Sequence, residues 1–180
     1  MKKFIIITYL IFLQLFTTQF LSPVTAQEKP PVLNVYFSPN GGSLDAILNQ
    51  LRSAKKTIFI HAYEITSPKI EKEIVKAHRR DLKIEIIIDH TRSTSKDSMA
   101  IFLFKQGVSV LTDKKHPKSH NKVIIIDREF IITGSYNFTK AAEKNAENVI
   151  IIMDPKIAEI YIKNFKEHAE HSKPFTPKEK

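Results

Sequence analysis

The chain has 180 residues, which is room for one domain, or for one domain and a leader segment. Its 42% of hydrophobic residues can build a core, which excludes wholesale disorder, and its lack of cysteine excludes a disulfide scaffold, a thiolate metal site and a cysteine nucleophile. The 28 Lys and Arg residues outnumber the 19 Asp and Glu residues, a formal net charge of +9, which favours polyanionic partners such as nucleic acid, anionic lipid or cell-wall polymer.

The N-terminal segment has the pattern of a signal peptide. Two lysines precede an almost wholly apolar run over residues 4–16, and small residues suit cleavage after Ala26. We therefore expect residues 1–26 to be a leader that exports the domain, to the periplasm or the medium if the source is bacterial. The alternative is an uncleaved membrane anchor, because the apolar stretch nearly reaches the length of a span when it is extended past residue 16.

The chain after the leader is predicted to form one catalytic domain over residues 27–171. Short runs rich in β-branched and aromatic residues predict strands at residues 32–37, 57–63, 83–88, 108–111, 122–126, 130–133 and 149–153. The Lys- and Pro-rich residues 172–180 are expected to be a flexible basic tail.

Helices are predicted between these strands. Apolar residues spaced by three and four, with Ser43, Pro68 and Pro155 at helix starts, predict three of them, and a fourth is expected over residues 98–106. Alternating strands and helices predict an α/β fold with a mixed, mostly parallel β-sheet flanked by helices. The sheet is expected to be mixed because the strands at 122–126 and 130–133 suggest a hairpin.

One group of polar residues indicates chemistry. His120 and Lys122 are two apart at the start of a strand, so their side chains share a face, and packing explains such a pair poorly. Histidine can act as a nucleophile or proton carrier near neutral pH, and lysine can hold a phosphate oxygen. Gly134-Ser135-x-Asn137 follows the next strand with a tight backbone and with hydroxyl and amide donors. Together these residues predict a phosphodiester site that requires no metal.

The full pattern His120-x-Lys122-x4-Asp127-x6-Gly134-Ser135-x-Asn137 resembles the HKD signature of the phospholipase D superfamily. The chain further resembles the small, secreted, single-motif bacterial endonucleases of that superfamily at residues 37–42, 62–63, 66–68 and 147–149. Family members work with two facing motifs, and this chain has one. The resemblance therefore implies a homodimer in which both copies of His120 meet at a shared cleft.

The resemblance also implies a role for each residue. One His120 would attack phosphorus and form a phosphohistidine, while the other would protonate the leaving oxygen and then activate water. Lys122 and Asn137 would bind the non-bridging oxygens, with Ser135 as an additional donor. Glu147 matches the family's acid that orients the histidine ring.

The acid of the motif, Asp127, belongs to the candidate catalytic set, but it lies at the far end of the strand from His120. A structural or supporting role is therefore expected for it. No metal and no cofactor is implied. Beside the motif, Lys114, Lys115 and Lys118 form a basic cluster that could grip a nucleic-acid backbone, although such runs are usually only solvated.

Other polar residues have simpler interpretations. His61 lies in an apolar strand, which favours a core or rim position. Asp89 and His90 follow a strand end, where a site-rim role and a loop-capping role are equally expected. His168 and His171 are three apart on a helix and could chelate a metal, yet no carboxylate partner is evident and a solvated face is favoured.

Three functions fit these observations to different degrees. The favoured one is a non-specific endonuclease that hydrolyses DNA, with RNA as a further possible substrate. The alternative keeps the chemistry but acts on phospholipid head groups, for which no amphipathic insertion loop is evident after the leader, so membrane contact is expected only through an uncleaved leader. A non-catalytic polyanion-binding protein would require the motif to be vestigial, although every key position is present.

Overall fold

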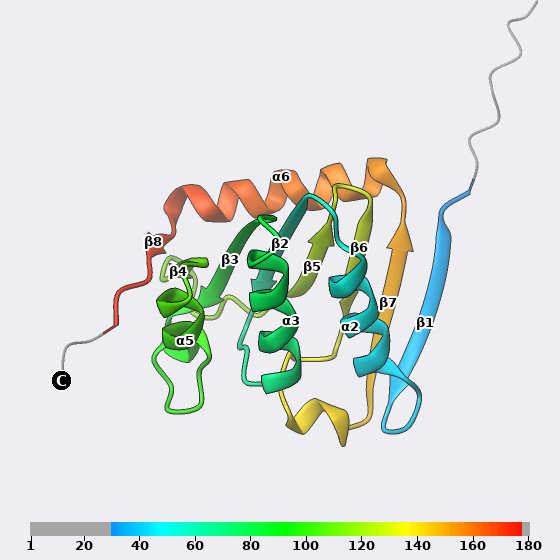
Figure 1. Cartoon of the computed structure of the whole chain (residues 1–180), viewed down its shortest axis with the longest axis horizontal. Coiled ribbons are helices and arrows are strands. Elements are labelled where there is room, and N and C mark those ends of the chain that lie inside the picture. The colour runs from blue at the N-terminus through cyan, green and yellow to red at the C-terminus, as the bar shows by residue number, and fades with distance from the viewer. Residues whose placement is uncertain (1–29, 178–180) are drawn as a thin grey trace, which may run out of the picture. The chain divides into compact units, whose positions relative to one another are not determined.

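The computed structural model describes residues 30–177, and the expected leader at 1–26 lies outside this range. The part of the chain from Pro31 onward forms one unit built on an eight-stranded sheet, with strand order β1-β7-β6-β5-β2-β3-β4-β8 (Figure 1). The strands are β1 (Val32–Ser38), β2 (Thr57–Ala62), β3 (Lys83–Asp89), β4 (Ser109–Asp113), β5 (Lys122–Ile126), β6 (Phe130–Gly134), β7 (Glu147–Met153) and β8 (Lys173–Pro174).

Helices cover both faces of this sheet. The helices α2 (Ser43–Ser53), α3 (Pro68–His78) and α5 (Ala100–Lys105) lie in front of it in Figure 1, and α6 (Pro155–His171) covers the opposite face. Two short elements complete the unit, α4 (His90–Ser93) and the 3-10 helix η1 (Ala141–Glu143). The α/β architecture and the flanking helices are thus as predicted.

The two faces have separate cores because side chains alternate along each strand. In β2, Ile58 and Ile60 join the core under α2 and α3, while Phe59 joins the core under α6. The neighbouring β5 follows the same rule, with Ile124 in the first core and Ile125 in the second. Even-numbered positions of these two strands therefore face α2 and α3, and odd-numbered positions face α6.

The expectation of a mostly parallel sheet is wrong. Only the pairs β2·β3 and β3·β4 are parallel, and the other five neighbouring pairs are antiparallel. Parallel neighbours need a crossover, which α3 and the α4–α5 segment supply. No helix crosses over between β5 and β6, which are joined by residues 127–129, so they form an antiparallel hairpin as predicted.

The residues after α6 also differ from the expected flexible tail. Lys173 and Pro174 pair with β4 as β8, and the backbone amide of Phe175 donates to the Val110 carbonyl over 2.8 Å. Phe175 is only 4% exposed and packs against the Phe104 ring, with 6.0 Å between ring centroids. The buried aromatic ring explains why this segment docks on the sheet. Over residues 30–177, no helix has both the length and the apolar character needed to cross a membrane.

Candidate active site

The candidate site lies at the end of the sheet where the parallel strands β2 and β3 finish. Lys122 opens β5 opposite Ala62, the last residue of β2, and the Tyr63 amide donates to the Asn121 carbonyl over 2.7 Å. This antiparallel pairing places Lys122 at the start of β5, and His120 in the loop just before it, beside the carboxyl ends of the neighbouring strands. Ligand sites of α/β proteins occur at this end of the strands.

The two predicted central residues meet, although His120 precedes the strand that Lys122 opens. The Lys122 Nζ lies 3.0 Å from the His120 Nε2 and donates to the His120 carbonyl over 3.1 Å. Desolvation lowers the pKa of His120, and the positive charges of Lys122 and Lys118 lower it further. The lowered pKa favours the neutral form of the His120 ring, which is the form that a nucleophile requires. Desolvation likewise lowers the pKa of Lys122, with the carboxylates of Glu147 and Glu64 opposing this shift.

An aromatic ring and a guanidinium form one wall of the site. The Tyr63 ring lies edge-on to the His120 ring, with 4.5 Å between centroids, and the Lys122 Nζ is 5.5 Å from the centre of the Tyr63 ring. From the other side, the Arg92 Nε donates to the Tyr63 hydroxyl over 2.8 Å, and the guanidinium carbon lies 4.8 Å from the ring centroid. Tyr63 thus connects a second cation to the histidine–lysine pair.

A buried carboxylate holds Arg92 and the histidine loop in place. Asp89, which is 1% exposed, accepts hydrogen bonds from the Thr91 and Arg92 amides and caps α4. Its Oδ2 accepts from the Ser119 amide over 2.8 Å, one residue before His120. Of the two roles expected for Asp89, the structure supports the capping role. His90 is exposed at the start of α4.

The segments 134–137 and 147–148 form the opposite wall. The Ser135 hydroxyl donates to the Glu147 carboxylate over 2.5 Å and accepts from the Asn148 amide over 3.0 Å. Gly134 has φ +146°, and a Cβ at this position would stand 2.3 Å from the Asn148 carbonyl oxygen, so glycine is required for this close approach. The Asn137 Oδ1 is buried without a hydrogen-bond partner among the described residues. The Glu147 carboxylate in this wall is close enough to Lys122 to raise the pKa of its ammonium group.

With this geometry established, the chain can be compared with known proteins. Residues 47–169 match a family model described as cardiolipin synthase, PLD-like domain. The chain belongs to the phospholipase D superfamily. Among relatives, the phospholipase D of Rickettsia felis is 42% identical over 130 residues, which cover 72% of this chain and 65% of that protein. A mitochondrial cardiolipin hydrolase of Chlamydomonas reinhardtii is 30% identical over 72% of this chain and 58% of its own length.

Solved structures of the superfamily share the fold. The phospholipase D family member Nuc from Salmonella typhimurium superimposes with a TM-score of 0.77 and 35% identity, covering 81% of this chain and 99% of that one. NucT from Helicobacter pylori, at 22% identity and a TM-score of 0.76, shows the fold alone. The chain spans 65% of the phospholipase D relative from R. felis but nearly all of the Nuc structure.

The structure gathers most of the superfamily motif but not all of it. His120 and Lys122 are in direct contact, and Ser135 and Glu147 bond to each other on the facing wall. No hydrogen bond between Glu147 and His120 is found among the described residues, so the expected orienting contact is not formed within the single chain. Asp127 does not reach the site.

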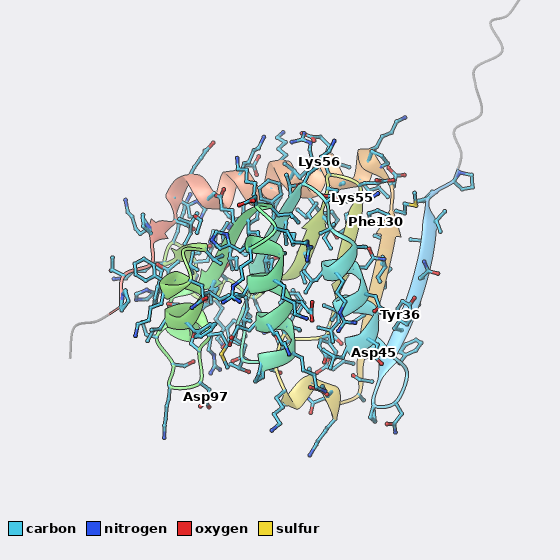
Figure 2. The ribbon with its side chains drawn as sticks, in the orientation of Figure 1. Tyr36, Asp45, Lys55, Lys56, Asp97 and Phe130 are labelled. Atoms are coloured by element: carbon cyan, nitrogen blue, oxygen red, sulfur yellow. The ribbon has the colours of Figure 1, made fainter. Side chains whose placement is uncertain are left out.

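The position of Asp127 agrees with the supporting role expected for it. Its carboxylate accepts from the backbone amides of Lys55, Lys56 and Thr57 over 2.8, 2.7 and 2.9 Å. Figure 2 shows Lys55 and Lys56 near Phe130 at one end of the sheet, and Asp97 at the opposite end. Asp127 therefore fixes the connection from α2 to β2 at the far end of β5 from His120.

Sequence reasoning missed the roles of Tyr63, Glu64 and Arg92. Their signals were weak because each lies just after a strand, in a segment without a repeating pattern. The Asp89-x-Thr91 sequence, which begins at the last residue of β3, is a usable signal, since an aspartate before a helix is a typical N-cap. By contrast, His61 is 3% exposed and bonds to the Ser119 hydroxyl over 2.7 Å, which confirms the core position expected for it.

Proposed function

We propose that this chain is a phosphodiesterase that hydrolyses nucleic acid, with DNA as its main substrate, at a site completed by a second copy of the chain. The observation that carries the proposal is the contact between the His120 imidazole and the Lys122 ammonium, together with the Glu147 carboxylate, which raises the pKa of Lys122 and accepts from the Ser135 hydroxyl. A tetrahedral phosphate needs a nucleophile in line with the leaving oxygen and cations beside its other oxygens. His120 and Lys122 would supply the nucleophile and one such cation.

The reaction would proceed in two balanced steps. In the first, the lone pair on the His120 Nε2 forms an N–P bond, the P–O bond to the leaving group breaks, and an acid protonates the departing oxygen. In the second, water adds to phosphorus, the N–P bond breaks, and the same acid, now a base, takes the proton of the water. Over residues 30–177 of the single chain we identify no group placed as that acid, which supports its supply by His120 of a second copy.

The surface next to the site supports a polyanionic substrate. Lys114, Lys115 and Lys118 are all exposed in the loop that leads to His120. An extended phosphate backbone would contact several of these cations at once, and binding would weaken steeply with added salt because counterions are released. The match to 99% of the Nuc chain further supports a small phosphodiesterase that consists of this one domain.

The second candidate is hydrolysis of phospholipid head groups. The names of two relatives support it, a phospholipase D and a mitochondrial cardiolipin hydrolase, although this chain spans only 65% and 58% of those proteins. Both candidates use the same attack on phosphorus. They differ in the surface around the site, and the lysine cluster favours nucleic acid.

One panel experiment separates the candidates. Protein starting at Gln27 is incubated without added divalent cation, and with EDTA, on plasmid DNA, single-stranded DNA, RNA and cardiolipin vesicles. We expect cleavage of DNA that falls by more than about 1,000-fold in His120→Ala, with His78→Gln as the control histidine variant. Equal cleavage by His120→Ala would refute the proposed nucleophile, whereas release of lipid products without DNA cleavage would establish the second candidate.

A further inference from the structure

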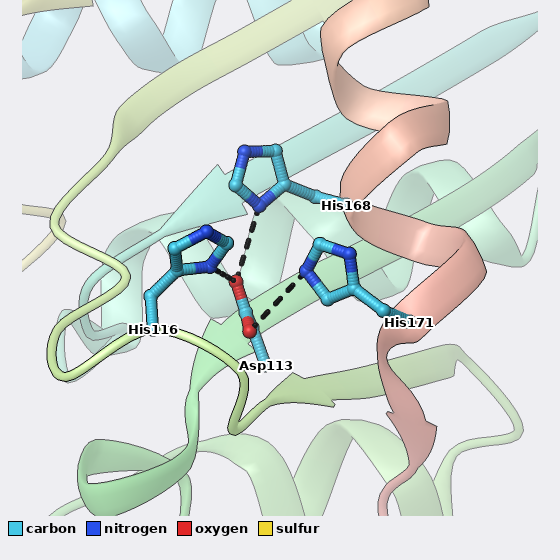
Figure 3. Close-up of side chains that lie close together, drawn as sticks. All are labelled: Asp113, His116, His168 and His171. Atoms are coloured by element: carbon cyan, nitrogen blue, oxygen red, sulfur yellow. Dashed lines mark hydrogen bonds and ion pairs between the residues drawn. The ribbon is translucent and has the colours of Figure 1, made fainter.

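A second cluster of polar side chains lies on the face of the sheet that α6 covers. Asp113 is the last residue of β4 and is fully buried, and His116 follows it in the loop toward β5. His168 and His171 extend from the last turn of α6 toward the same carboxylate (Figure 3). The expectation of a solvated face for these two histidines is therefore wrong. Their carboxylate partner lies 55 residues before His168, too far for any local pattern to reveal.

The distances in this cluster match a four-coordinate metal site. The Asp113 Oδ2 lies 3.0 Å from the His116 Nδ1 and 3.1 Å from the His168 Nδ1, and the Asp113 Oδ1 lies 3.4 Å from the His171 Nε2. One ligand atom from each residue can be chosen so that all four lie within 4.8 Å of one another. A tetrahedral zinc ion with bonds of about 2.0–2.1 Å separates its ligand atoms by about 3.4 Å. A small inward movement of the rings would therefore complete the coordination shell.

Hydrogen bonding alone does not account for all three rings. His116 and His168 each can donate from Nδ1 to the carboxylate, but the His171 Nε2 is buried and has no hydrogen-bond partner among the described residues. The three rings also crowd together, with centroids 4.9, 5.3 and 5.2 Å apart. The His171 Nε2 is thus buried and makes no hydrogen bond within the part of the chain that the structure describes, and it points at a carboxylate that two other imidazoles share. A cation bound between the four side chains would satisfy all of these groups.

We propose that Asp113, His116, His168 and His171 bind one divalent transition metal ion, with zinc the best match, in a closed structural site. Three imidazole nitrogens and one carboxylate oxygen form a borderline donor set that suits zinc better than magnesium or calcium, which prefer oxygen ligands. Four protein ligands leave no open position for water or substrate, which is typical of a structural site. The ion would fasten the end of α6 to the loop that precedes the candidate active site.

The surroundings of the cluster support this structural role. The Lys115 amide donates to the Asp113 Oδ1 over 2.9 Å, which orients the carboxylate as outer contacts do in metal sites. The His168 ring packs on the His61 ring, with centroids 4.7 Å apart, and His61 bonds to Ser119, the residue before His120. The proposed ion would thus stabilise the base of the catalytic loop, and no step of the proposed reaction passes through it.

Metal content of the untagged protein tests the proposal directly. Protein starting at Gln27 is stripped with a chelator, reloaded with zinc and gel-filtered, and its zinc is measured by mass spectrometry. We expect about one zinc per chain in the wild type and in His120→Ala, and at least a tenfold weaker retention in His171→Gln and His168→Gln. His78→Gln serves as the matched control, because this histidine lies outside the cluster. Reloading with Co²⁺ should give the strong visible absorption of a four-coordinate site.

Thermal melting gives a second readout that does not depend on activity. Zinc at about 100 times its dissociation constant should raise the melting temperature of the wild type by about 5–10 °C and that of His171→Gln by much less. If the histidine variants do not fold, Asp113→Asn and the zinc titration of the wild type replace them. A wild type that retains no zinc and gains no stability from it, or a His171→Gln that matches the wild type, would overturn the proposal.

Discussion

At the start of β5 and just before it, neighbouring side chains point to opposite faces of the sheet. Ser119 and Asn121 reach the buried His61 under α6, over 2.7 and 3.3 Å, while His120 and Lys122 meet each other at the candidate active site. A strand produces this separation because successive side chains alternate. The histidine–lysine pair could be found from sequence for the same reason, since a spacing of two needs no knowledge of the rest of the fold.

The charge around His120 gives a prediction about pH. Burial, Lys122 and Lys118 all lower the pKa of His120, so Lys118→Gln should raise it. The nucleophile must be neutral, and activity is lost as pH falls through its pKa. The acid limb of the kcat/KM profile should therefore move to higher pH in Lys118→Gln, while Lys114→Gln, which removes a lysine that is not among those perturbing His120, should leave it in place. A histidine titration by NMR checks the same shift, and a limb that moves to lower pH would contradict it.

At the scale of elements, the helices and strands could be predicted from local sequence patterns, whereas most of the pairing of strands could not. The seven strands and four helices expected from the sequence are present, with ends within two residues of those predicted where an end was specified, because periodic apolar residues reflect burial. The order of the strands in the sheet could not be predicted in the same way. The placement of β5 between β6 and β2, which makes most pairs antiparallel, depends on contacts between residues about 60 positions apart. The short α4 and the two-residue β8 are too brief to show a period.

The connection from α2 to β2 gives a prediction about Asp127. Its carboxylate is the acceptor for three backbone amides at residues 55–57, so Asp127→Ala should lower the free energy of unfolding by about 2–4 kcal/mol. The turnover of the folded enzyme should change little, because these contacts lie at the far end of β5. Urea unfolding and kcat measured on the same preparation check both parts. Asp127→Asn, which keeps one oxygen acceptor, should lose less stability, and a loss of turnover as large as that of His120→Ala would show a catalytic role instead.

The docked C-terminal strand gives a second prediction at this scale. Phe175 is 4% exposed among core residues next to Phe104, so Phe175→Ala should destabilise the fold by about 3 kcal/mol. The neighbouring Lys173→Ala removes an exposed side chain and should change stability by less than about 0.5 kcal/mol. Urea denaturation of both variants measures the difference. Equal stability of the two variants would mean that the segment does not dock in solution.

At the scale of the whole molecule, the sequence gives the chemistry of one motif from its residues, and a homodimer only through the resemblance to the superfamily. His120, Lys122, Ser135, Asn137 and Glu147 come from local motifs, and their residue types identify phosphate chemistry. The Asp113 cluster and the Tyr63–Arg92 contact join segments that are far apart in the chain, and they become visible only in the folded structure. The second imidazole that we propose for the active site would belong to another copy of the chain, so contacts within one chain do not reveal it.

A shared site makes a quantitative prediction about mixed subunits. If each site needs His120 from both copies, then after free exchange of equal amounts of wild type and His120→Ala, about one quarter of the dimers carry two intact copies. The activity of the mixture should therefore be about one quarter of that of the same total amount of wild type, against about one half if each chain acts alone. Mixing His120→Ala with Lys122→Ala should restore nothing, because a shared site needs both motifs intact. Sedimentation velocity on the same samples checks that dimers form, and a fully active monomer at working concentration would contradict the shared site.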